Sequence, residues 1–67
     1  MKRNLTFEQH ATNVLRIWEE LDYEASALIR VSQDYVCHNW PWICTEPVIY
    51  RQTVNRIRGL VLDEVLS

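Results

Sequence analysis

Residues 37–44, CHNWPWIC, decide the expected fold, because they contain the strongest interruption of helical pattern in the chain. Pro41 lies inside this stretch and Pro47 follows it shortly, and the chain has no other proline. A proline interrupts a helix and disfavours helical backbone at the residue before it. The sequence therefore predicts a turn over about residues 38–45, with one helix on each side of it.

The residues before this turn have the pattern of one long helix over about residues 6–37. Thr6 and Gln9, three positions apart, match a capping box at its start. Beyond them, apolar or small residues recur in alternating steps of four and three, which is a heptad pattern. The positions of this seam are Phe7, Ala11, Val14, Trp18, Leu21, Ala25, Leu28, Ser32 and Tyr35.

The residues after the turn predict a second, shorter helix over about residues 46–66. Thr45 is a suitable N-cap, and Pro47 is tolerated in a first helical turn. The apolar seam of this helix consists of Tyr50, Val54, Ile57, Val61 and Val65. Gly59 lies inside this helix. There the glycine either weakens the helix or permits the close approach of another helix.

These two helices predict a single all-α domain over residues 1–67, folded as a two-helix hairpin. The chain is 67 residues long and 48% hydrophobic. Two helices alone would leave much of each apolar stripe in water, whereas two hairpins paired as a homodimeric four-helix bundle would cover both. The residues expected in this dimer core are Val14, Trp18, Leu21, Leu28, Val54, Ile57 and Val61.

The bulk properties favour a cytoplasmic protein without a cofactor. The formal net charge of −2 gives no general attraction for nucleic acid or for an anionic membrane. The first ten residues, MKRNLTFEQH, lack the apolar run of a signal peptide, and no apolar window approaches the ~20 residues of a membrane span. In the cytosol Cys37 and Cys44 are expected to stay reduced, although they could close a short loop in an oxidising compartment.

No residue pattern indicates catalysis or a metal site. Cys37, His38 and Cys44, with the distant His10, do not have the spacing of a zinc site. The sequence places no serine or cysteine beside His10, as a nucleophile paired with a base would require. The acidic run EELDYE, residues 19–24, is expected to be a solvated band in the middle of the first helix. The chain is therefore expected not to be an enzyme.

The two tryptophans of the turn carry the leading functional hypothesis. Pro41 favours extended backbone at Trp40, which would point Trp40 and Trp42 to the same side. Such a pair could cover the end of the bundle or anchor a partner, since tryptophan is enriched at binding hot spots. We expect a small adaptor or inhibitor, of the kind that phages or mobile elements encode, which docks on a larger protein. The expected partner-binding residues are Tyr35, Trp40, Trp42 and Ile43.

Two alternatives stay open at this stage. Arg51, Asn55 and Arg58 form a stripe on the second helix, with Arg56 beside it. In a dimer this stripe would occur twice and could bind the phosphates of nucleic acid, although an ordinary solvated face would have the same composition. The chain could also be a structural subunit whose apolar surplus is covered by a different protein.

Overall fold

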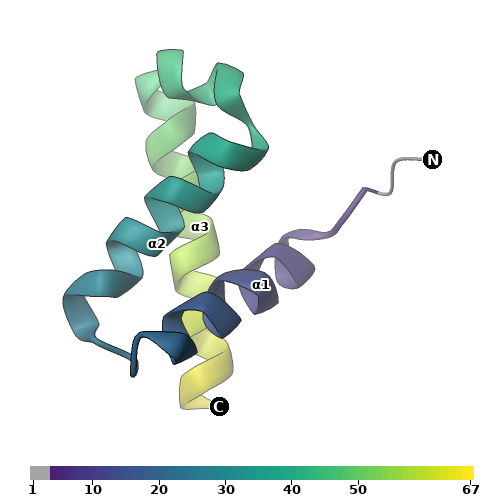
Figure 1. Cartoon of the computed structure of the whole chain (residues 1–67). Coiled ribbons are helices and arrows are strands. Elements are labelled where there is room, and N and C mark those ends of the chain that lie inside the picture. Colours follow the sequence, from purple (N-terminus) through teal and green to yellow (C-terminus); the bar gives the residue numbers. More distant parts are fainter. Residues whose placement is uncertain (1–3) are drawn as a thin grey trace.

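The computed structural model describes residues 4–67 and contains helices joined by short turns, with no strand among these residues. Helix α1 spans Phe7–Glu20, α2 spans Ala25–Asn39, the 3₁₀ helix η1 spans Pro41–Thr45, and α3 spans Pro47–Leu66. In Figure 1, α1 and α2 diverge from the turn that joins them, and α3 runs behind both. The prediction of an all-α chain is confirmed.

The prediction of one unbroken helix over residues 6–37 is wrong, because the chain turns between α1 and α2. Asp22 and Tyr23 have φ angles of 58° and 55°, in the left-handed region that ends a right-handed helix. Trp18 stabilises the turn, since its indole Nε1 donates to the Glu24 carbonyl over 2.7 Å. The Tyr23 ring packs edge-on against Trp18 at 5.2 Å between centroids. The fold is therefore a three-helix arrangement and not a two-helix hairpin.

Side chains cap the first two helices. At α1, the Gln9 amide donates to Thr6 Oγ1 over 3.2 Å and the Thr6 amide donates to Gln9 Oε1 over 2.8 Å, which completes the predicted capping box. At α2, the Glu24 carboxylate accepts from the backbone amide and the hydroxyl of Ser26. Thr45 does not cap α3 as predicted, because its hydroxyl donates to the Trp42 carbonyl over 2.8 Å.

One chain encloses its own apolar core, because α3 packs against both α1 and α2. The buried apolar residues are Ala11, Val14, Trp18, Ala27, Leu28, Val31, Val36, Ile43, Val54, Ile57 and Val61. All the residues predicted for a dimer core are among them except Leu21, which lies in the turn and is 46% exposed. Most of the predicted core is thus covered within one chain, whereas Leu21 and Val65 of the two seams stay exposed.

Two small residues of the helices lie in contrasting surroundings. Ser32 is fully buried in α2, and its Oγ has no hydrogen-bond partner within the described part of the chain. Gly59 in α3 has open space around it, because a Cβ built there meets no atom within 4 Å. Within this chain Gly59 therefore does not mark a close approach of two helices.

Candidate functional site

An aromatic cluster forms where the start of α1 meets the end of α2. Phe7 and His10 lie in the first turns of α1, and the turn at residues 21–24 brings α2 back beside them. The His10 ring centroid is 4.7 Å from that of Trp40 and 5.5 Å from that of Tyr35. The Phe7 ring lies 6.1 Å from Trp40. Residues that are far apart in the sequence thus build one end of the molecule.

A short hydrogen-bond chain orients the buried His10 side chain. Asn13 Nδ2 donates to the Tyr35 hydroxyl over 3.0 Å, and that hydroxyl lies 2.7 Å from His10 Nδ1. When the phenol proton is donated to Nδ1, the proton of the neutral imidazole is on Nε2. Burial lowers the pKa of His10 below its usual 6.5, which favours this neutral form.

A groove of about 480 Å³ lies beside this cluster. Its volume is in the range of about 300–1,000 Å³ that is typical of ligand sites in proteins. Aromatic and aliphatic side chains form most of its wall, with two asparagines, His10 and a threonine among them. The lining residues are Asn4, Leu5, Phe7, His10, Asn39, Trp40, Trp42, Ile43 and Thr53. Such a wall suits a ligand that places one apolar side chain in the groove beside a single polar group.

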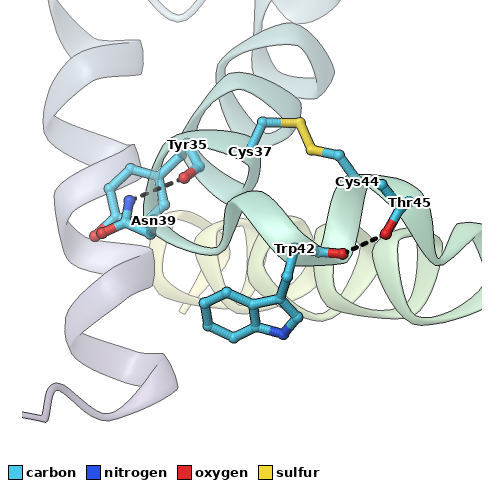
Figure 2. Close-up of a disulfide and its surroundings, with 6 residues drawn as sticks. All are labelled: Tyr35, Cys37, Asn39, Trp42, Cys44 and Thr45. Carbon is cyan, nitrogen blue, oxygen red and sulfur yellow. Dashed lines mark hydrogen bonds between the residues drawn. A yellow bond between two sulfur atoms is a disulfide. The ribbon is translucent and has the colours of Figure 1, made fainter.

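The two tryptophans that were predicted to act as a pair line the same groove but differ in their exposure to solvent. Trp40 is half-buried against His10, whereas Trp42 is 64% exposed. In Figure 2 the Trp42 ring extends from η1 on the side away from the disulfide. The prediction of a shared side assumed an extended backbone, whereas residues 41–45 form a 3₁₀ helix. Both tryptophans nevertheless contribute to the wall of one groove.

The other two predicted anchors are largely engaged within the chain. Ile43 is buried in the core. Tyr35 is half-buried, and its hydroxyl bonds to His10 and Asn13. Of the four predicted partner-binding residues, Trp42 is the one with most of its side chain in solvent.

The thiols that were expected to stay reduced are joined in a disulfide. Cys37, near the end of α2, is bonded to Cys44 in η1, with 6.0 Å between their Cα atoms (Figure 2). That separation is typical of protein disulfides. The prediction of reduced thiols rested on the expected compartment, whereas the pairing that was considered for an oxidising compartment is the one present. The disulfide ties η1, which carries Trp42, to α2.

The predicted arginine stripe on α3 is divided between different environments. The Arg56 guanidinium lies over the Phe7 ring, 4.2 Å from its centroid, and so brings a positive charge near the groove. Arg58 Nη2 donates to Asn55 Oδ1 over 3.3 Å. Arg51 is exposed and borders a separate small groove with Ile29 and Gln33 between α2 and α3.

Sequence reasoning missed His10 and Phe7 as parts of a site. Both were assigned to the start of one long helix. In such a helix the first turns would lie too far from residue 40 for contact. The capping box places Phe7 and His10 in the first turns of α1, and recognition of the break at residues 21–24 would have brought these turns back to Trp40.

The described residues, 4–67, contain neither a cluster of metal ligands nor a helix that could span a membrane. No three side chains of His, Cys, Asp or Glu in this range gather in a way that could bind a metal ion. None of the helices in the same range combines the length and the apolar character needed to cross a membrane. The chain matches no protein-family model, no curated protein and no solved structure.

Proposed function

We propose that this protein is a non-enzymatic adaptor or inhibitor that binds an apolar segment of a larger protein at the groove beside Trp42. The observation that carries the proposal is the 64% exposure of Trp42 at the edge of an aromatic groove. When such an exposed aromatic residue binds a partner, its backbone loses little conformational entropy, because a disulfide already restrains it. Tryptophans in such positions are frequent hot spots of protein interfaces.

The chemistry of the groove supports a partner segment of a particular kind. Its apolar walls favour an aliphatic or aromatic side chain. His10 lines the groove, and when Tyr35 donates to Nδ1 the neutral ring carries a proton on Nε2 that a carbonyl oxygen could accept. The Arg56 charge over Phe7 favours a carboxylate nearby. We therefore propose an apolar residue flanked by an acidic one as the preferred segment.

This mode of action requires only binding. A small adaptor or inhibitor acts by occupying a surface of a larger protein. Phages and mobile elements encode proteins of this kind, and such an origin is part of the proposal. Action in the cytoplasm likewise remains a proposal.

A selection from a random-peptide library displayed on phage tests the docking proposal. We expect enriched peptides to share an apolar residue next to Asp or Glu, and Trp42→Ala to weaken their binding at least about tenfold, as at a hot spot. Val48→Ala is the control, because Val48 is an apolar residue that is 68% exposed and does not line the groove. Peptides that bind the Trp42→Ala protein as well as the native protein would refute the proposal.

Self-association is a second candidate, at the opposite end of α3. Figure 1 shows α3 crossing α1 near its C-terminal end, and these two helices are in contact. Apolar side chains remain exposed at helical spacing near the C-terminal end of α3. These residues are Leu62, Val65 and Leu66. We propose that any homodimer forms from folded three-helix chains through this surface, and not through the predicted four-helix seam.

Light scattering tests this association. A mass of two chains that falls to one in Leu66→Asp, with unchanged helical circular dichroism, would support a dimer through this surface. A dimer that persists in Leu66→Asp would place the interface elsewhere. A native protein that stays monomeric at high concentration would rule the association out.

The nucleic-acid alternative has less support. Arg56 and Arg58 already contact Phe7 and Asn55, and the net charge is −2. A gel shift with RNA or duplex DNA at low salt that disappears in Arg51→Ala would revive this alternative. The third alternative, a structural subunit of a hetero-complex, would be supported if the purified chain aggregates unless it is co-expressed with another protein.

A further inference from the structure

We infer that the Cys37–Cys44 disulfide is a redox switch for the groove, with the oxidised form competent for binding and the reduced form weakened. This inference rests on the docking function proposed above and assigns its regulation. It is carried by the placement of the two cysteines relative to the groove and by the short 3₁₀ helix between them, which local hydrogen bonds hold.

The disulfide encloses one wall of the groove. Its cysteines are seven positions apart, and four groove-lining residues lie between them in the sequence. These residues are Asn39, Trp40, Trp42 and Ile43. The remaining wall belongs to the N-terminal part of the chain and to α3, outside the ring that the disulfide closes. Opening the ring therefore acts on one side of the groove.

Besides the disulfide, the backbone of this wall is held mainly by local hydrogen bonds, among them the Trp40 amide donating to the Val36 carbonyl over 2.8 Å. The Ile43 amide donates to the Trp40 carbonyl over 2.9 Å, and the Glu46 amide donates to the Ile43 carbonyl over 2.8 Å. Thr45 Oγ1 donates to the Trp42 carbonyl, and the Ile43 side chain is buried. A 3₁₀ helix of five residues has weak hydrogen-bond geometry and is marginal by itself. With the disulfide open, Ile43, Trp40 and the Thr45–Trp42 hydrogen bond still hold the segment, and Trp42 loses the added restraint of the closed ring.

The disulfide is open to exchange with a dithiol. Cys44 is exposed and Cys37 is half-buried. A thiolate of the dithiol attacks Sγ of Cys44, the S–S bond breaks, and Cys37 leaves as a thiolate that takes up a proton. The second thiol of the reductant then displaces Cys44 from the mixed disulfide. Two electrons and two protons thus pass to the protein, and the dithiol becomes a disulfide.

Reduction should weaken binding without unfolding the chain. The helices α1, α2 and α3 pack through a core that contains neither cysteine. Ordering a freed tryptophan and its backbone on binding opposes association. We expect the affinity for a Trp42-dependent peptide to fall about tenfold in the reduced protein. A loss of this size is expected because the mobile Trp42 side chain and its turn must be ordered when the peptide binds.

The experiment compares oxidised protein, protein reduced with dithiothreitol, and the Cys37→Ser/Cys44→Ser double variant. Each is labelled with 5-fluorotryptophan, and the fluorine resonances are assigned with Trp18→Phe, Trp40→Phe and Trp42→Phe. We expect the Trp42 resonance to narrow and move toward its position in the unfolded chain on reduction, while Trp18, buried in the core, stays unchanged. Peptide affinity is measured on the same samples by fluorescence anisotropy of a labelled peptide from the phage selection.

The outcomes separate this inference from the docking proposal. Binding that is independent of Trp42 in the oxidised protein would refute docking before any reductant is added. Trp42-dependent binding of equal strength in all three samples would refute the switch alone, as would an unchanged Trp42 resonance. Loss of helical circular dichroism on reduction would also refute it, because the disulfide would then be a staple of the whole fold.

Discussion

Ser32 shows how a single buried hydroxyl can limit stability. It lies in α2 with no exposed surface, and no described residue accepts or donates a hydrogen bond at its Oγ. An unpaired buried polar group costs about 1–3 kcal/mol, and alanine has the higher helix propensity. We expect Ser32→Ala to raise the free energy of unfolding by about 1 kcal/mol in urea denaturation.

Ser26→Ala is the matched control for this measurement. The Ser26 hydroxyl donates to the Glu24 carboxylate at the start of α2, so its removal should not stabilise the chain. A loss of stability in Ser32→Ala would mean that the hydroxyl is satisfied by water or by the carbonyl one turn earlier in the helix.

His10 predicts a pH dependence of stability. Burial lowers its pKa below 6.5, so the unfolded chain takes up a proton before the folded chain does as the pH falls. The free energy of unfolding should therefore start to decrease as the pH drops through about 6.5, and this loss is complete below the lower pKa of the folded state. His10→Gln should flatten this part of a urea-stability profile. His38→Gln, at an exposed position, is the control, and a profile that flattens equally in both variants would contradict the assignment.

Single residues could be predicted from the sequence where local chemistry decides their role. The Thr6–Gln9 capping box forms as expected, since it depends on residues three positions apart. The partners of His10 could not be predicted, because Tyr35 and Trp40 reach it only through the tertiary fold. The different exposures of Trp40 and Trp42 depend on the 3₁₀ helix, which the Pro41 signal alone does not specify.

At the scale of the elements, the turn between α1 and α2 stores backbone strain. Asp22 has a φ of 58°, a conformation that glycine adopts without steric penalty. We expect Asp22→Gly to raise the free energy of unfolding by up to about 1 kcal/mol, because relief of the left-handed conformation exceeds the added entropy of the unfolded chain. Thermal or urea denaturation measures the change.

Tyr23→Gly provides the contrast at the neighbouring position. It relieves a similar φ of 55° but also removes the ring that packs against Trp18. It should therefore be less stable than Asp22→Gly. If Asp22→Gly is instead the less stable variant, the turn depends on the Asp22 side chain and not on its backbone conformation.

This turn is also where the sequence prediction of the elements failed. The heptad seam passes through Leu21 and Ala25 without interruption, and the turn contains no glycine or proline. The acidic residues of EELDYE were interpreted as a solvated band, although Glu24 in fact caps α2. Acidic residues are typical of helix N-termini, and that signal could have located the start of α2. The helix after Pro47 was easier to predict, because proline marks its first turn.

At the scale of the whole molecule, the missed turn changed the expected assembly. Two long helices would have needed a second chain to cover their seams, whereas the extra turn allows α1, α2 and α3 to cover one another. The residues of the seams were nevertheless identified well, since Val14, Ile57 and Val61 are fully buried. Hydrophobic periodicity thus predicted which side chains are buried but not which chain covers them.

The closed core predicts that folding does not require association. If folding were coupled to dimerisation, a change in protein concentration from about 1 to about 100 µM would shift the apparent stability by about 2.7 kcal/mol. We expect Leu66→Asp, which places a charge on a side chain that is 81% exposed, to keep its helical circular dichroism and a urea midpoint that is constant over this range. Ala11→Asp, at a buried position of α1, should unfold the chain at any concentration. A midpoint of Leu66→Asp that rises with concentration would show that the three-helix core is incomplete without a second chain.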